Sequence, residues 1–368
     1  MTGAFDFLDP LGPEKIIHVG SDAAGLRAIV VIDNTATGPS IGGVRMAPDV
    51  TLAECARLAR AMTLKNAVAG LPHGGGKSVI FADPAMERVR KEGLIRAFAQ
   101  AIGQITDYIP GPDMGTDETC MAWIHDEISR AVGLPRVIGG IPLDDIGATG
   151  FGVAVATEVA QAFGGVGLAG ARVAIQGFGA VGRHAARHLA DKGARIVAVS
   201  DSRGAVFDPD GLDLSRLLAL KAENKSVTGL ANVRVDHRDA IIAADCDILI
   251  PAARPDFINK SNAADVTAKL IVQGANIPVT AAAEDCLHQR GILVIPDFIA
   301  NAGGVICASV EYHGGTENQA MTAIEEKIRR NTTEVLQQGR DLRVTPRQAA
   351  TTLAKARVRE AMGLRRTF

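Results

Sequence analysis

The chain has 368 residues, a length that favours two domains, and its 47% hydrophobic and 22% charged content is ordinary for a folded soluble protein. A net charge of −2 and only 4% aromatic residues argue against nucleic acid or a membrane surface as a partner. Five scattered cysteines without a CxxC pair and a start without a secretory pattern predict no metal site and a cytoplasmic protein.

The first 135 residues alternate between apolar strand patterns and amphipathic helix patterns, which predicts an α/β domain. Thr51 and Glu54 form a capping box for the first helix, and Gly70 can end it. Asp83 and Pro84 predict the start of the next helix, as a cap and a first-turn proline. We expect strands at 26–33 and 78–83, and helices at 51–70, from 83 onward, and from near 116 to 133.

A glycine- and proline-rich stretch at 134–148 predicts a hinge, because the alternation of strand and helix restarts after it. Thr345 and Pro346 mark a helix start within a helical tail at 318–362. This second region predicts a doubly wound, Rossmann-type parallel sheet. Its expected strands are 171–176, 194–201, 246–252, 269–274 and 292–297, with a helix at 180–192.

The segment "GFGAVG" places Gly177, Gly179 and Gly182 between an expected strand and an expected helix. Glycines at this spacing permit a tight turn, close approach to a pyrophosphate, and close packing of the helix on the strand. Asp201 ends the next strand, where a carboxylate can bind the adenosine ribose and repel a 2′-phosphate. NAD is therefore the expected cofactor, and NADP stays open because Arg203 could meet that phosphate.

The stretch "GLPHGGGKS" (70–78) resembles a phosphate-binding loop but has Leu71 where the first glycine is required. It also leads from a helix to a strand, the reverse of the order in such loops. We instead expect a glycine hinge that brings Lys77 close to Lys65 of the preceding helix, with Asp113 supplying an acid nearby. Two adjacent ammonium groups lower each other's pKa, which suits one of them to acid–base chemistry.

Ordered motifs along nearly the whole chain resemble the glutamate/leucine/phenylalanine/valine dehydrogenase family. They are "GPSIGGVRM", "AMTLKNAVAGLPHGGGKSV", "GPDMGT", "GATGFGV", "QGFGAVG", "ILIPAA", "QGANIP" and "IPDFIANAGGV". This resemblance implies reversible NAD(P)-linked oxidative deamination of an L-amino acid to a 2-oxo acid and ammonia. It also implies an N-terminal α/β substrate and assembly domain, 1–140 plus a C-terminal helix at about 340–368, and a Rossmann-type domain at 141–339. Homo-oligomers are expected, and the cleft between the two domains is expected to close.

The resemblance also implies roles for individual residues. Lys77 is expected to activate the water that attacks the imine, Asp113 to move protons, and Lys65 to bind the substrate carboxylate with backbone groups of Gly42 and Gly43. The other expected substrate contacts are Ile41, Gly111, Asn301, Val305 and Ala308. Thr149 and Asn276 are expected to place the nicotinamide or its ribose. The full set of expected cofactor contacts is Gly177, Gly179, Ala180, Val181, Gly182, Asp201, Ser202, Arg203, Thr149, Ala252 and Asn276.

Two positions bear on the amino acid side chain. In the glutamate branch, the residue that matches Ile41 is a lysine and the residue that matches Ala308 is a serine. A carboxylate buried against isoleucine and alanine would be costly, so we predict an apolar substrate such as leucine, valine or phenylalanine. Gly111 could leave room for a larger side chain.

Glutamate remains the alternative, since "QGANIP" and "EYHGGTENQA" look more like that branch and Arg254 is a cation that could reach the site. His73, within the glycine stretch, departs from the family pattern. A non-catalytic dinucleotide sensor is a further alternative, and it predicts decay of Lys65, Lys77 or Asp113, all of which are present.

Overall fold

The computed structural model describes residues 6–164 and 166–365, which form two compact units. The first unit contains the chain up to Leu143, Val305–Ala320 and the residues from Thr351 on. The second contains Asp144–Gly304 and Met321–Ala350. The break at 143/144 falls within the glycine- and proline-rich stretch. The division differs from the expected one at the C-terminal end, because 305–320 group with the first unit and 340–350 with the second.

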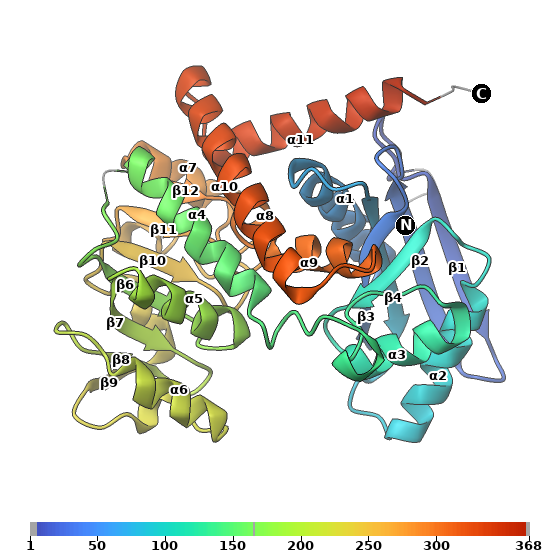
Figure 1. The fold of residues 1–368 in the computed structure, drawn as a ribbon, viewed down its shortest axis with the longest axis horizontal. Helices are drawn as coiled ribbons and strands as arrows, with labels where there is room; N and C mark the ends of the chain where they lie inside the picture. The colour runs from blue at the N-terminus through green and yellow to red at the C-terminus, as the bar shows by residue number, and fades with distance from the viewer. Residues whose placement is uncertain (1–5, 165, 366–368) are drawn as a thin grey trace. The chain divides into compact units, whose positions relative to one another are not determined.

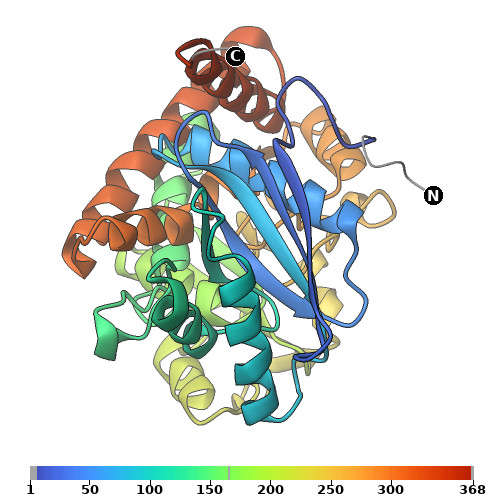
Figure 2. The same cartoon turned by 90° about the vertical axis from the view of Figure 1, so that its right-hand side faces the viewer.

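The first unit is built on a five-stranded sheet (Figure 2). Its order is β1 (Lys15–Ser21), β2 (Leu26–Asn34), β4 (Gly74–Phe81), β3 (Ser40–Ala47) and β5 (Tyr108–Pro112). Strands β3, β4 and β5 run parallel, and β2 runs antiparallel to both of its neighbours, β1 and β4. Of these strands the sequence predicted only β2 and β4, whereas β1, β3 and β5 were not expected.

Both faces of this sheet are covered by helices. Helix α1 (Leu52–Val68) packs on one face, where Cys55 and Ala59 contact Val31 and Val79 in a buried apolar cluster. The other face is covered by α2 (Arg88–Ala101) and α3 (Glu118–Ile128). The functional side chains described below lie on the α1 side of the sheet.

The observed helix starts agree with the predicted cap at Thr51 and disagree with the one at Asp83. The Thr51 hydroxyl accepts from the backbone N–H of Glu54 at 3.1 Å, as expected, but the Glu54 carboxylate pairs with Arg45 instead of completing the box. The expected helix start at Asp83 is wrong, because this carboxylate accepts from the N–H of Ala85 in a local turn and α2 begins at Arg88. A short polar side chain serves a turn as readily as a helix.

The glycines before Lys77 do not form the predicted hinge; they lie inside strand β4. A Cβ on Gly74 would lie 1.8 Å from the carbonyl oxygen of Asn34, and one on Gly75 would lie 2.0 Å from the backbone nitrogen of Thr63 in α1. Glycine is therefore required here because a neighbouring strand and a helix approach the backbone closely. Its function is close packing rather than reversal of the chain.

The second unit contains a seven-stranded sheet, mostly parallel, as predicted for a doubly wound domain (Figure 1). Helices α4 (Ala148–Gly164) and α5 (Ala180–Asp191) lie on one face, while α7 (Ala281–Gln289) packs with two short 3₁₀ turns on the other. The hairpin strands β8 and β9 were not expected. The strand order is β12 (Leu293–Ile295), β11 (Leu270–Val272), β10 (Ile248–Pro251), β6 (Arg172–Gln176), β7 (Arg195–Ser200), β8 (Ala205–Phe207) and β9 (Arg234–Asp236).

The remaining helices are α6 (Leu214–Ala222), α8 (Asp297–Ala300), α9 (Gly303–Tyr312), α10 (Glu317–Leu342) and α11 (Pro346–Gly363). The predicted start of the last helix is confirmed, because the Thr345 hydroxyl accepts from the N–H of Gln348 and the Gln348 side chain accepts from the N–H of Thr345. Among the described residues, no helix combines the length and the apolar character needed to cross a bilayer.

Candidate active site and cofactor site

Three charged side chains of the first unit meet beside the parallel strands. Lys77, on β4, is only 6% exposed and forms an ion pair with Asp113, which directly follows β5. Arg45, on β3, donates from Nε to the same carboxylate oxygen of Asp113 at 3.2 Å. Its Nη1 donates to Glu54 at 2.5 Å. The sheet therefore brings together two cations, one each from β3 and β4, and an acid from the end of β5.

Charge pairing decides the ionisation of Asp113. Burial opposes the charged form, but Lys77 and Arg45 outweigh burial and hold the pKa of this carboxyl below its usual value. A carboxyl with a lowered pKa stabilises the fold above its unfolded pKa, and this contribution is lost as the pH falls through the folded pKa. Asp113 is thus a carboxylate at neutral pH and can accept a proton there.

Lys65 lies on the last turn of α1 and is half-buried. The next residue, Asn66, donates to the carbonyl oxygen of Gly74 at 2.7 Å, which fixes this turn of the helix against the start of β4. Besides Lys77, Arg45 contacts the carboxylate of Asp113, a contact that the sequence did not suggest. The mutual lowering of pKa between Lys65 and Lys77 stays a prediction.

The two glycines of "IGGVR" have different structural functions. A Cβ on Gly43 would lie 2.7 Å from Cβ of Asp113 and 3.0 Å from Nζ of Lys77, so this glycine leaves the space in which the pair forms. A Cβ on Gly42 would lie 1.7 Å from the carbonyl oxygen of Gly76 on β4. The carbonyl oxygen of Gly42 also accepts from the buried Tyr108 hydroxyl at 2.9 Å. Tyr108 therefore fixes the backbone next to the charged pair.

The expected wall of the side-chain pocket is a small apolar cluster in the first unit. Ile41 and Ala308 are both buried in it. The other members are Ile109, Val132 and the partly buried Met62. A Cβ on Gly111 would lie 3.2 Å from a methyl group of Val132, and the extra room expected at this glycine stays a prediction. Val305 is partly buried on α9, one turn before Ala308.

His73 is a buried structural residue of the first unit. Its Nδ1 lies 3.3 Å from the carbonyl oxygen of Pro39, and its ring packs against the rings of Tyr312 and His313. Burial lowers the pKa of His73 to about 4, so the ring is neutral at pH 7. With Nδ1 as the donor to Pro39, this histidine contributes no positive charge to the charged cluster around Asp113.

In the second unit, Gly177 and Gly182 of "GFGAVG" have the turn and packing functions that the spacing predicts, and the phosphate contact of Gly179 stays a prediction. Gly177 has φ +94°, the left-handed region that favours glycine, and turns the chain after β6. A Cβ on Gly182 would lie 2.0 Å from the carbonyl oxygen of Gly177, so only glycine lets α5 pack this closely. A Cβ on Gly179 would point into open space. That space, at the N-terminal end of α5, fits a pyrophosphate.

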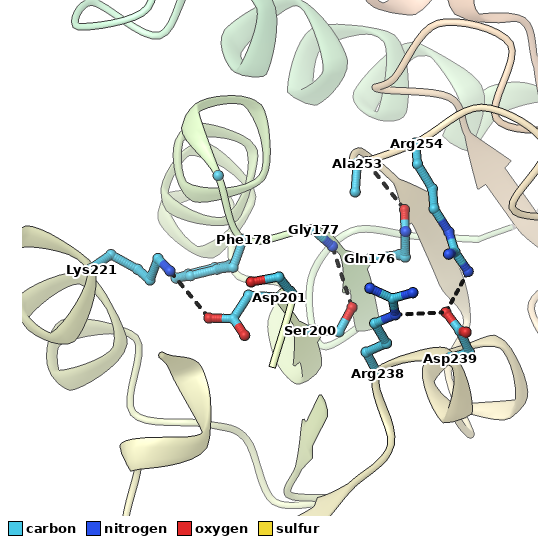
Figure 3. A pocket seen from close by; sticks show the side chains of 12 residues that line it. Gln176, Gly177, Phe178, Ser200, Asp201, Lys221, Arg238, Asp239, Ala253 and Arg254 are labelled. Atoms are coloured by element: carbon cyan, nitrogen blue, oxygen red, sulfur yellow. Dashed lines mark hydrogen bonds and ion pairs between the residues drawn. The ribbon is translucent and has the colours of Figure 1, made fainter. Parts of the chain in front are cut away.

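Gly179 lines a pocket of about 310 Å³ that lies entirely in the second unit (Figure 3). Of the expected cofactor contacts, Asp201 and Ser202 line this pocket, whereas the exposed Arg203 does not. The sequence did not single out the other charged residues of the lining, Lys221, Arg238 and Asp239. Arg254, expected as a possible substrate contact, lies here and pairs with Asp239 at 2.5 Å. No local sequence pattern points to these residues.

The remaining expected cofactor residues lie around the pocket or in a second group. Ala253, rather than the expected Ala252, lines the pocket, and Ala180 and Val181 form the first turn of α5. In the second group, the Asn301 amide donates to the side-chain oxygen of Asn276 at 3.0 Å. The side-chain oxygen of Asn301 is buried without a described partner, which fits a group that awaits a donor from a ligand.

Thr149, on the first turn of α4, belongs to the same region of the second unit. A Cβ on Gly304 would lie 3.2 Å from its hydroxyl oxygen, and a Cβ on Gly303 would lie 2.0 Å from the carbonyl oxygen of Ala148. The two glycines of "NAGG", which begin α9, therefore let this segment lie close to the start of α4. This contact places Thr149 beside the segment that carries Asn301.

A doubly wound sheet with this glycine turn, together with a separate site of buried acid and amine groups, defines a dinucleotide-dependent oxidoreductase. Residues 13–130 match the dimerisation-domain model of the Glu/Leu/Phe/Val dehydrogenases, and residues 139–366 match the model of the Glutamate/Leucine/Phenylalanine/Valine dehydrogenase family. The chain belongs to this family. It is an NAD(P)-dependent amino acid dehydrogenase that performs oxidative deamination.

Similar proteins carry the name glutamate dehydrogenase. One from Aeropyrum pernix is 41% identical, covering 90% of this chain and 85% of its own. An NADP(+)-dependent one from Pyrobaculum calidifontis is 39% identical, with the same two coverages. The solved hetero-hexameric glutamate dehydrogenase of Thermus thermophilus, in its Leu-bound form, is 30% identical with a TM-score of 0.86, covering 97% of this chain and 91% of its own. Whole-chain similarity therefore favours the glutamate branch over the expected leucine, valine and phenylalanine branches.

Proposed function

We propose that this amino acid dehydrogenase acts on an L-amino acid with an apolar side chain. The observation that carries this proposal is the buried apolar cluster around Ile41 and Ala308. Substrate choice depends on the few residues that contact the side chain, rather than on identity averaged over the chain. An isolated carboxylate loses several kcal/mol or more of hydration when it enters apolar surroundings without a partner. Ile41 and Ala308 carry no group that could pair with one.

L-glutamate is the second candidate, and the names of the similar proteins described above favour it. Under this alternative, a cation other than residue 41 must neutralise the side-chain carboxylate. Arg254 is poorly suited to this function, because its guanidinium is already paired with Asp239 at 2.5 Å. The two candidates make opposite predictions for the amino acid that the wild type turns over fastest.

The charged cluster of the first unit suits the proton transfers of deamination. In this proposal Lys65 binds the substrate carboxylate, and Asp113 takes a proton from the substrate amine. Lys77 holds the water that adds to the iminium carbon, and Asp113 returns a proton as ammonia leaves. The nicotinamide, when bound, supplies the hydride acceptor. Arg45 keeps Asp113 ionised between these transfers.

The proposal predicts the outcome of an amino acid screen followed by Ile41→Lys. The wild type should give the highest kcat/KM with leucine, valine or phenylalanine, measured by the absorbance of the reduced cofactor. Ile41→Lys should raise the ratio of kcat/KM for glutamate to that for leucine by about 100-fold or more, the effect of a newly paired buried charge. Ile41→Met, which keeps an apolar side chain of similar size, should leave the ratio within a few-fold.

Either of two results would contradict the proposal. Fastest turnover of glutamate by the wild type would establish the second candidate instead. An Ile41→Lys enzyme that folds and still discriminates as the wild type does would show that Ile41 does not line the pocket.

We further propose that the chain assembles as a homo-oligomer. The match of residues 13–130 to a domain described as a dimerisation domain supports this, as does the hexameric assembly named for the Thermus thermophilus structure. Light scattering on the purified protein should give a mass of two or more chains of 38.4 kDa. A monomer at micromolar concentration would contradict the proposal.

A further inference from the structure

The pocket beside Gly179 holds more positive than negative charge. Three cations line it, Lys221, Arg238 and Arg254, together with two carboxylates, Asp201 and Asp239 (Figure 3). The described lining therefore carries one surplus positive charge. A charged group of this lining can bind a ligand only where the protein's own hydrogen bonds and ion pairs leave it free.

The carboxylate of Asp201 is already fully engaged by the protein. One oxygen accepts from the N–H of Arg203 and from the Ser226 hydroxyl, both at 2.9 Å. The other accepts from the N–H of Val227 at 3.0 Å and from Nζ of Lys221 at 3.1 Å. A carboxylate offers about four acceptor sites, so all of them are used. Asp201 therefore has little capacity left to accept from the two ribose hydroxyls of NAD.

The second carboxylate is also neutralised. Asp239 accepts from Nη2 of Arg254 at 2.5 Å, a short charge-assisted contact. Arg238 lies farther away, with Nε 3.8 Å from the same oxygen, and no hydrogen bond of its guanidinium is found among the described residues. Once Lys221 is matched with Asp201 and Arg254 with Asp239, Arg238 is the cation left without an anion at hydrogen-bond distance. Its side chain is 45% exposed, so it is accessible from the pocket.

We propose that this pocket prefers NADP(H) to NAD(H), and that Arg238 and Lys221 bind the phosphate on the 2′-oxygen of its adenosine ribose. Such a phosphate carries a charge between about −1.5 and −2 at pH 7 and offers three strong acceptor oxygens. Arg238 can donate from its planar guanidinium, and Lys221 has two N–H donors beyond the one that Asp201 accepts. The Ser202 hydroxyl, on the same lining, can donate as well.

This proposal replaces the cofactor preference inferred from the sequence. An acid at the end of β7 suggested a repelled 2′-phosphate, but Lys221 neutralises that acid, and two backbone N–H groups and the Ser226 hydroxyl occupy its other acceptor sites. The sequence also suggested Arg203 as the phosphate contact, whereas Arg203 is exposed outside the pocket lining and Arg238 is within it. Substitution of each arginine in turn therefore tests whether Arg203 or Arg238 binds the 2′-phosphate.

The test measures binding of NADPH and NADH to the full-length protein by nicotinamide fluorescence, with no amino acid present. The wild type should bind NADPH about tenfold or more tightly than NADH, as expected for one added charge-assisted contact. Arg238→Gln should remove most of that difference by weakening NADPH alone, and Lys221→Gln should act in the same direction. The matched control, Arg203→Gln, should leave both affinities unchanged.

Three results would overturn the proposal. They are equal or tighter binding of NADH by the wild type, equal weakening of both cofactors in Arg238→Gln, and loss of the preference in Arg203→Gln instead. The preference should also decline as the pH falls below about 6, where the 2′-phosphate takes up a proton. Because no amino acid is used, failure here is distinct from failure of the proposed substrate.

Discussion

Replacing Lys77 with methionine is expected to lower kcat for deamination by about a thousandfold, within the range for loss of a group that positions water and protons. The ammonium group is buried and forms its ion pair with Asp113. Its removal leaves Arg45 as the remaining cation on that carboxylate among the described contacts. The pKa of Asp113 should then rise, because burial favours its neutral form.

Stopped-flow or steady-state absorbance of the reduced cofactor measures the loss in rate. Binding of NADPH, followed by fluorescence, should be nearly unchanged, because the cofactor pocket lies in the second unit. The matched control is Lys15→Met, which breaks a half-exposed ion pair with Asp107 in the same unit and should keep wild-type turnover. Wild-type turnover by Lys77→Met itself would remove Lys77 from the mechanism.

Asp113→Asn is the second substitution with a large expected effect. The amide has nearly the same shape as the carboxylate but cannot accept a proton from the substrate amine, so kcat should fall by about 10²- to 10⁴-fold. The substitution also leaves Lys77 and Arg45 near each other without their shared anion. Breaking a buried pair in this way costs about 3–5 kcal/mol, so the melting temperature should fall as well.

A double-mutant cycle separates catalysis from packing. If Lys77 and Asp113 act as one unit, the Lys77→Met, Asp113→Asn double variant should be about as slow as the worse single variant. In stability, the double variant should recover part of the loss seen with Asp113→Asn, because no unpaired Lys77 cation remains buried. Losses in kcat that simply multiply would show that the two residues act independently.

Local features of the fold were predictable because each is decided by neighbours in the chain. Thr51 and Thr345 cap helices through contacts three residues away, and the glycine turn at 177–182 needs only a strand before it and a helix after it. Predictions failed where one local pattern fits two structures. Asp83 before Pro84 suits a turn as well as a helix start, and the glycines before Lys77 suit a strand as well as a hinge.

The sequence by itself determined the two-part α/β organisation, the dinucleotide turn and the family motifs, since these depend on periodicity and short spacing. Tertiary structure decided which groups meet. Asp113 pairs with both Lys77 and Arg45 because β3, β4 and β5 lie side by side. The saturation of Asp201 and the surplus charge of Arg238 likewise depend on segments distant in sequence. Hydrogen bonds and ion pairs act over a few ångströms of space, and local spacing does not specify those distances.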